Sequence, residues 1–262
     1  MDHREAGRLW EDNAEAWTLL ARAGYDTYRD HLNTPAFFAA LHDVTGLRGL
    51  DIGCGEGHNT RLVAARGALV TGLDVSQTFI RHAEQWESEH PAGIRYVVAS
   101  AVELPFPDQT FHFATAFMSL MEAPEFEKAI SEAWRVLRPG GFLQCSITHP
   151  CFDTPHRRNL RGADGTTYAI EVGQYFRNKN GETDEWLFRA APAALKATLR
   201  KFKIPRFTRT LSEWLNAFIA AGFHIEYVGE PKPDDAAIAM TPSLQDAGVV
   251  PYFLHLRVKR RE

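Results

Sequence analysis

A short glycine-rich run constrains the fold of this chain more than any other stretch. Residues 50–57 read Leu-Asp-Ile-Gly-Cys-Gly-Glu-Gly, so an apolar segment ends in an acid and then places glycine at every second position. Glycine lacks a Cβ, which lets such a turn approach a ligand closely, and a following helix aims its N-terminal amides at the same place. A second apolar run, residues 68–73, ends in Asp74, where nucleotide-binding folds hold a ribose. The first half of the chain is therefore predicted to hold a nucleoside.

Two further stretches narrow this prediction. Residues 104–111 read Leu-Pro-Phe-Pro-Asp-Gln-Thr-Phe, and residues 136–141 read Val-Leu-Arg-Pro-Gly-Gly. Together with the glycine-rich run, they make residues 45–150 resemble the class I S-adenosylmethionine-dependent methyltransferases, within the branch that methylates small molecules (type 11-like). The resemblance implies S-adenosylmethionine as cofactor, S-adenosylhomocysteine as product and a small-molecule acceptor that is methylated on oxygen, nitrogen or carbon.

Helix-like and strand-like segments alternate along the chain, which predicts a Rossmann-like α/β fold. Its sheet is expected to be seven-stranded and mostly parallel, with one antiparallel edge strand and helices on both faces. Helices are expected at 5–24, 35–45, 58–66, 77–89 (capped by Ser76), 124–137 and 211–221. Strands are expected at 47–52, 68–73, 94–99, 111–117, 142–148, 223–228 and 252–258, with Pro139-Gly140-Gly141 as a turn before the fifth.

The same pattern divides the chain into four segments. An N-terminal lid is expected at 1–45, the cofactor-binding core at 46–149, an inserted substrate cap at 150–208 and the end of the core at 209–262. The cap is inferred because a segment of that length is rarely a bare loop. Residues 229–250, rich in Pro and Asp, are expected to form a long exposed connection.

Ligands of open α/β sheets bind beyond the carboxyl ends of the strands. The resemblance therefore assigns the methionine part of the cofactor to Asp51, Gly53, Cys54, Gly55 and Gly57. Asp51 would organise the amino group, or it would only stabilise the turn.

Asp74 would accept hydrogen bonds from both ribose hydroxyls, because a carboxylate offers two acceptor oxygens. Val75 would pack on the adenine.

The adenine end departs from the family pattern at one position. Ser100 stands where an Asp usually accepts from the exocyclic amine, so this contact is expected to be weaker. Ala101 and Val102 would still offer a backbone amide. Phe117 and Met118, after the fourth strand, would lie near the transferred methyl group, although methionine commonly fills core gaps.

The lid and the cap supply further candidates. Tyr25, Tyr28 and Arg29 are expected to close over the cofactor, with Arg29 pairing with its carboxylate. Trp17 is a further candidate for this role, with packing within its helix as the favoured alternative. Aromatic side chains of the cap would shape an apolar acceptor pocket or form the cap's own core, and they are Tyr168, Tyr175, Phe176 and Trp186.

His149, after the fifth strand, is the candidate general base, since histidine titrates near neutrality. The alternative is that it holds the cap by a hydrogen bond. Methyl transfer from a sulfonium can also proceed without a strong base, because the positive sulfur already activates the methyl carbon.

Composition disfavours several classes of function. A net charge of −4 gives no basic field for nucleic acid, and no apolar run is long enough to span a bilayer. Three cysteines without framework spacing and a charged N-terminal segment predict a cytoplasmic protein. The histidines are scattered without ligand spacing, so no metal site is expected.

Two alternative functions stay open. A nicotinamide-dependent oxidoreductase is disfavoured, because the glycines run Gly-x-Gly-x-Gly rather than Gly-x-Gly-x-x-Gly. A non-catalytic cofactor-binding module is allowed by the departures at Ser100 and at His112, which stands where the family usually has Asp.

Overall fold

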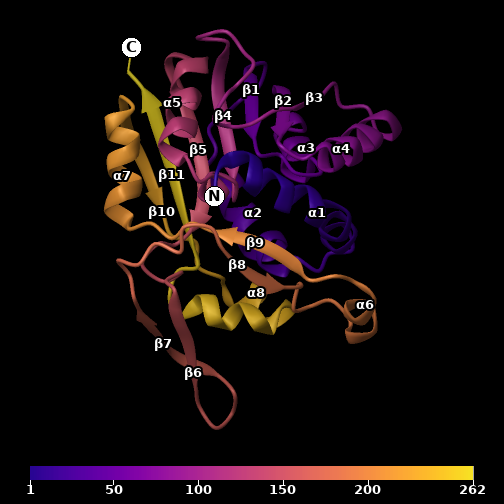
Figure 1. Ribbon diagram of the computed structural model, residues 1–262, viewed down its shortest axis with the longest axis vertical. Coiled ribbons are helices and arrows are strands. Elements are labelled where there is room, and N and C mark those ends of the chain that lie inside the picture. The colour runs from indigo at the N-terminus through magenta and orange to yellow at the C-terminus, as the bar shows by residue number, and fades with distance from the viewer. Residues whose placement is uncertain (262) are drawn as a thin grey trace.

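A seven-stranded sheet forms the centre of the computed structural model, which describes residues 1–261. Its strands span Arg48–Ile52 (β1), Leu69–Asp74 (β2), Arg95–Val98 (β3), Phe111–Phe117 (β4), Leu137–Thr148 (β5), Phe223–Gly229 (β10) and Phe253–Arg260 (β11). The strands lie in the order β10-β11-β5-β4-β1-β2-β3 (Figure 1). β11 alone runs opposite in direction to the other six strands, and it lies one strand in from the edge, between β10 and β5. The predicted fold class is confirmed.

The longer helices lie close to where periodicity predicts them. Ser76 caps α4 by accepting a hydrogen bond from the backbone amide of Phe79, and Thr210 forms a capping box with Glu213 at the start of α7. The helices are α1 (His3–Arg22), α2 (Thr34–Ala40), α3 (His58–Ala64), α4 (Gln77–Glu89), α5 (Phe126–Val136), α6 (Ala193–Thr198), α7 (Leu211–Ala220) and α8 (Asp235–Met240).

The fifth strand begins earlier than predicted. β5 starts at Leu137, where α5 ends, so the Pro139–Gly141 stretch lies within the strand rather than in a separate turn. The pairing with β4 shifts in register there, and Gly140 has a positive φ of 76°. Between the paired positions Phe111–Leu137 and Phe113–Phe142, β5 takes up three extra residues without ending, which is why the turn-like sequence was misleading.

Two predicted segments are wrong in extent. The helix expected at 35–45 ends at Ala40, and a π-helical turn, η1 (Arg29–Asn33), leads into it. The connection expected to be exposed at 229–250 contains α8 and a 3₁₀ segment, η3 (Pro242–Gly248), in which Leu244 and Ala247 are buried. Their burial beside Phe253 folds this connection against the rest of the chain.

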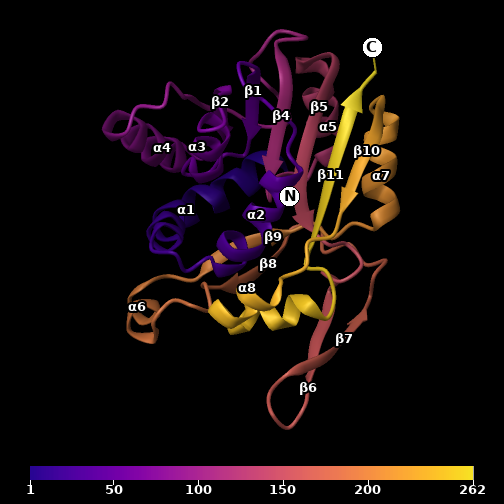
Figure 2. The same cartoon turned by 180° about the vertical axis from the view of Figure 1, so that it is seen from behind.

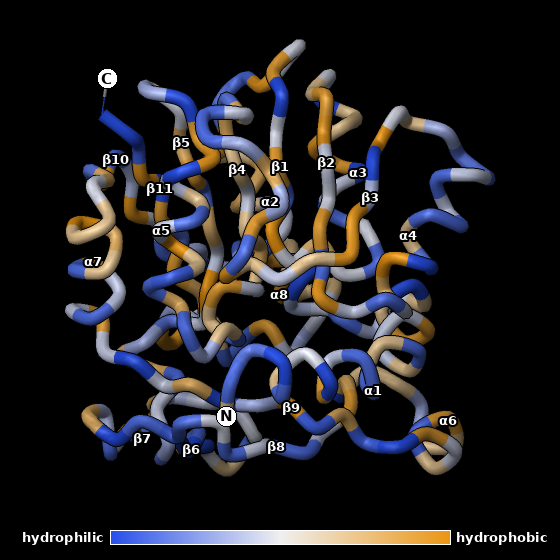
Figure 3. Tube along the Cα trace, turned by 45° about the horizontal axis from the view of Figure 1, so that its top comes forward, coloured by the Kyte–Doolittle hydropathy of each residue, from blue (hydrophilic) through white to orange (hydrophobic). Residues whose placement is uncertain are grey.

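Two layers of helices cover the sheet. Phe37 of α2 and Val63 of α3 pack with Phe113 and Phe142 on one face. α5 and α7 pack on the other face, where Ile130 joins the largest apolar cluster. Figure 3 shows the apolar residues concentrated along the inner strands, whereas the periphery is more hydrophilic.

The segment after β5 folds as two hairpins. β6 (His156–Arg161) pairs with β7 (Thr167–Gly173), and β8 (Glu182–Trp186) pairs with β9 (Phe202–Arg206). The β6–β7 hairpin projects away from the sheet, whereas β8–β9 crosses beyond the carboxyl ends of the central strands (Figures 1 and 2). The boundaries predicted for lid, core and cap stay predictions.

The lid helix and the cap form one wall. The buried Asn13 side chain of α1 accepts from the Lys203 amide and donates to the Lys203 carbonyl, both at 3.0 Å. Trp17 packs edge-on against Phe188 and at a tilt to Phe202, each at 4.9 Å between ring centroids. Segments far apart in the sequence are thus fixed to one another.

We expect Asn13→Ala to lower the free energy of unfolding by about 1–3 kcal/mol, because it leaves two backbone groups of β9 without partners. Denaturant unfolding measures this change. The neighbouring exposed Asp12→Ala serves as the control and should change stability by less than about 0.5 kcal/mol. Equal effects of the two substitutions would show that the Asn13 hydrogen bonds do not join lid and cap.

Candidate active site

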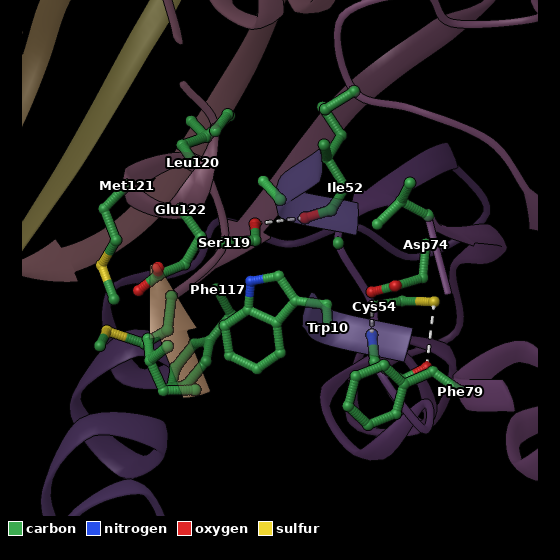
Figure 4. Close-up of a pocket in the computed structure, with 18 of the residues that line it drawn as sticks. Trp10, Ile52, Cys54, Asp74, Phe79, Phe117, Ser119, Leu120, Met121 and Glu122 are labelled. Carbon is green, nitrogen blue, oxygen red and sulfur yellow. Dashed lines mark hydrogen bonds between the residues drawn. The ribbon is translucent and has the colours of Figure 1, made fainter. Parts of the chain in front are cut away.

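A cavity of about 340 Å³ lies beyond the carboxyl ends of the central strands. Residues of the lid, the glycine-rich loop, the segments after β2, β3 and β4, and the cap all line it (Figure 4). Of the predicted site residues, the following line the cavity: Arg29, Gly53, Cys54, Gly55, Asp74, Val75, Ser100, Ala101, Val102, Phe117 and Met118.

The glycines of the loop have different tasks. Gly53 and Gly55 adopt positive φ of 72° and 54°. A Cβ on Gly53 would lie 2.3 Å from the Cβ of Ser119, whereas one on Gly55 would meet no atom within 4 Å. Gly57, also with positive φ, lies outside the lining, and a Cβ there would lie 2.5 Å from the Tyr96 hydroxyl. Gly57 therefore serves packing at the start of α3, and Gly55 leaves room beside the cavity.

Two buried side chains around this loop, Asp51 and Cys54, are placed differently relative to the cavity. Asp51 lies outside the cavity lining, and its carboxylate accepts from the hydroxyls of Thr60 at 2.6 Å and Thr115 at 2.7 Å. This placement fits the turn-stabilising alternative, and a contact with an amino group stays a prediction. Burial raises the pKa of the Cys54 thiol, so this cysteine stays neutral at physiological pH.

Asp74 lies at the end of β2 with each oxygen already held by one backbone amide. Oδ2 accepts from the Gly55 amide and Oδ1 from the Ser76 amide, both at 2.9 Å. A carboxylate oxygen can accept a second hydrogen bond, so both oxygens keep capacity for a diol. Burial raises the pKa of Asp74 to about 6, against the two amides, which favour the ionised form.

The segments after β3 and β4 complete this half of the cavity. The Ser100 hydroxyl accepts from the Val102 amide over 3.4 Å, a long hydrogen bond that orders the turn weakly. Met118 adopts a positive φ of 55°, and its amide donates to the Ser146 carbonyl at 2.8 Å. A positive φ outside glycine is strained and is often retained at functional sites.

Of the three lid residues Tyr25, Tyr28 and Arg29, only Arg29 lines the cavity, and its pairing with the cofactor carboxylate stays a prediction. Its Nε pairs with Asp30 at 2.7 Å, and its guanidinium donates to the Ala21 carbonyl. Tyr25 and Tyr28 lie outside the lining, which corrects their predicted role. Tyr25 packs in the apolar cluster between lid and cap. The Tyr28 hydroxyl donates to the Ser243 carbonyl, and its ring stacks on Tyr252.

His149 is not placed to act as the general base. It lies outside the lining, its Nε2 is 2.8 Å from an oxygen of Glu230, and its Nδ1 accepts from the Cys151 amide. The alternative, a histidine that ties the start of the cap to the segment after β10, fits this geometry. His112 is likewise structural, because its Nδ1 accepts from the Arg48 amide.

The sequence missed much of the other half of the cavity. Trp17, for which packing within its helix was the favoured interpretation, lines the cavity, as does Trp10 one heptad before it. Trp186 fulfils the cap prediction, whereas Tyr168 and Phe176 are 67% and 89% exposed. The Tyr175 hydroxyl accepts from the Leu211 amide, outside the lining. Further lining residues that no motif marks are Glu122, Phe188, Ile204 and Arg206.

Within residues 1–261, no three His, Cys, Asp or Glu side chains gather as a metal-binding group. Among the helices of that part of the chain, none combines the length and the apolar character needed to cross a membrane.

Known proteins resemble the chain most clearly over its core. Residues 50–145 match the family model described as a methyltransferase domain. A fatty-acid O-methyltransferase of Mycolicibacterium smegmatis is 31% identical over 63% of this chain and 62% of its own length. The squalene methyltransferase 1 of Botryococcus braunii is 40% identical over 37% of this chain and 27% of its own length. The chain thus spans less than two thirds of these curated relatives.

Solved structures extend the likeness beyond the core. An S-adenosylmethionine-dependent methyltransferase from Mesorhizobium loti is 28% identical, with a TM-score of 0.68 over 86% of this chain and 96% of that one. A structure from Listeria monocytogenes, described as a putative S-adenosylmethionine-dependent methyltransferase, shares the fold at 21% identity and a TM-score of 0.69.

We expect Asp74→Ala to weaken S-adenosylhomocysteine binding by about 1–3 kcal/mol, since it leaves the ribose hydroxyls unpaired. Only the ionised carboxylate accepts two hydroxyl hydrogen bonds, and its pKa is about 6. Affinity of the unsubstituted protein should therefore fall about tenfold between pH 7 and pH 5.

Calorimetric titration at both pH values tests this expectation. The exposed Asp164→Ala, at the tip of the β6–β7 hairpin, is the control and should retain both the affinity and its pH dependence. An Asp74→Ala variant that kept the same fall in affinity at pH 5 would remove Asp74 from the ribose site.

Proposed function

We propose that this chain, which belongs through residues 50–145 to the class I S-adenosylmethionine-dependent methyltransferases, transfers a methyl group to a small-molecule acceptor. The observation that carries the proposal is the Asp74 carboxylate beside Gly55. It lies in a cavity that continues past the strand ends into an aromatic region between lid and cap. One region suits a nucleoside, and the other is free for an acceptor.

The residues present fit the cofactor of this family. The Gly53–Gly55 turn would hold the methionine part, Asp74 the ribose, and Val75 with the 100–102 turn the adenine. Arg29 would face the amino-acid end from the lid. When bound, S-adenosylmethionine supplies a methyl carbon that its sulfonium already activates. The task of the chain is then to align the acceptor for in-line attack and to exclude water.

The acceptor region favours a molecule with an apolar body. Its lining is mainly aromatic and aliphatic, and such surfaces bind apolar ligands by removing them from water. The relatives named for fatty-acid, squalene and demethylmenaquinone methylation carry names of largely apolar small molecules, which supports this class. The lining residues concerned are Trp10, Trp17, Met121, Trp186, Phe188 and Ile204.

The proposal includes a cytoplasmic location and a small molecule, rather than nucleic acid, as the methyl acceptor. All three cysteines, each within the described part of the chain, are free thiols, as a reducing cytoplasm keeps them. The net charge of −4 favours a small-molecule acceptor over nucleic acid.

The decisive measurement is calorimetric titration of the protein with S-adenosylhomocysteine and, separately, with NADH. We expect S-adenosylhomocysteine to bind in the micromolar range, about −8 kcal/mol, and NADH not to bind. Binding of NADH alone would replace the proposal by an oxidoreductase. Methyl-labelled S-adenosylmethionine offered with a panel of apolar acceptors then separates an enzyme from a non-catalytic binding module, which would transfer no label.

A further inference from the structure

Glu122 carries a carboxylate in the acceptor region that forms no salt bridge within residues 1–261. It ends η2 (Leu120–Glu122), the 3₁₀ turn after β4, and lines the cavity with Trp10 and Met121 (Figure 4). Its Oε2 is buried and has no hydrogen-bond partner among residues 1–261. A buried acceptor without a partner is costly, so a native chain that retains one commonly uses it.

Hydrogen bonds from Arg209 fix the backbone on both sides of Glu122. The buried Arg209 guanidinium donates to the carbonyls of Met121, Ala123 and Pro124, on both sides of Glu122. The same guanidinium lies 4.1 Å above the Phe126 ring. Planar guanidinium groups fix several acceptors at once, so Arg209 holds this turn in one orientation.

The charged groups around Glu122 are engaged elsewhere. Arg206 of β9 pairs with Asp153 and lies 3.7 Å from Asp184, and Arg209 is committed to backbone carbonyls. Burial is the main cause that raises the pKa of Glu122 to about 7, reinforced by Asp153 and Asp184 and opposed by the two arginines. From α1, His3 also lines the cavity, and its Nδ1 is 2.8 Å from Glu125.

A second unpartnered polar atom lies in the same region. The indole Nε1 of Trp10 is buried without an acceptor in the described part of the chain. The remaining surface there is supplied by apolar side chains such as Trp186, Phe188 and Ile204. An apolar ring that carries one hydroxyl or amine group would satisfy this arrangement, because its O–H or N–H can meet the Glu122 carboxylate.

We propose that Glu122 accepts the hydrogen bond of the acceptor's hydroxyl or amine and takes its proton during methyl transfer. This inference rests on the proposed function. As the acceptor oxygen or nitrogen forms its bond to the methyl carbon, the S–CH₃ bond of the sulfonium breaks and leaves a neutral thioether. The acceptor's O–H or N–H bond breaks, and its proton moves to Glu122, which returns it to water after product release.

Two substitutions separate the charge of Glu122 from its polarity. Glu122→Gln keeps the size and removes the ionisation, and Glu122→Leu removes both. The exposed Glu84→Gln, on α4 outside the cavity, is the matched control. S-adenosylhomocysteine titration should give unchanged affinity in all three variants at pH 8. If the unsubstituted protein did not bind S-adenosylhomocysteine, that result would contradict the proposed function.

A ligand-free measurement tests the carboxylate itself. The pKa is raised from 4.5 to about 7, so between these pH values the folded state keeps a proton that the unfolded chain has lost. The free energy of unfolding of the unsubstituted protein therefore falls as the pH rises through this window. The melting temperature of Glu122→Gln relative to the unsubstituted protein should therefore rise from pH 5.5 to pH 8. No such rise is expected for Glu84→Gln, and a flat difference for Glu122→Gln would overturn the assignment.

A pair of probe ligands tests the hydrogen bond. 2-Naphthol and naphthalene differ by one hydroxyl, and we expect the protein loaded with S-adenosylhomocysteine to bind 2-naphthol about tenfold more tightly at pH 8. Glu122→Leu should abolish this preference and Glu84→Gln should keep it. Equal affinities in the unsubstituted protein, binding of neither probe, or a preference that survives Glu122→Leu would each overturn the proposal.

Discussion

The hydrogen bonds on the Asp74 carboxylate hold the whole cofactor half of the cavity together. One oxygen fixes the glycine-rich loop through the Gly55 amide, and the other fixes the start of α4 through the Ser76 amide. The loop and the helix follow different strands, so their relative position depends on this side chain. A carboxylate suits the task because it accepts several hydrogen bonds at once and can still accept from a ligand.

The same junction extends to the lid. The Ser76 hydroxyl, which caps α4, donates to Glu11 of α1 at 2.5 Å, and Thr78 donates to the other Glu11 oxygen at 2.7 Å. α1 then reaches the cap through Asn13. Two sets of hydrogen bonds, joined by the backbone of α1, thus link the end of β2 to β9. The acceptor region is bounded by elements that the cofactor region positions.

The sequence predicted best what local rules decide. Alternating apolar runs placed the core strands, Ser76 marked the start of α4, and the spacing to Asp74 identified a carboxylate that lines the cavity. It failed where tertiary contacts decide. His149 follows a strand end as predicted, but the direction of its side chain depends on Glu230, which lies 81 residues away.

The acceptor region also depends on tertiary contacts that the sequence does not reveal. Glu122 looks like an ordinary turn acid in the sequence, and only the folded chain shows that its Oε2 is buried and that Arg209 holds its turn. Trp10 and Trp17 share a helical face, which the sequence does reveal. No periodicity shows that the cap hairpin β8–β9 covers that face, because the pairing is between segments far apart in the chain.

Charge connects the two halves of the cavity. Burial raises the pKa of Asp26, Asp74 and Glu122 toward neutrality. A positive charge that binds in the cavity would stabilise the ionised form of each of these carboxyls. A sulfonium brings that charge, and methyl transfer removes it by leaving a neutral thioether. The carboxyls then favour protonation more strongly at the moment when the acceptor must lose a proton. In the proposed reaction, the loss of charge at sulfur and the uptake of a proton at Glu122 reinforce each other.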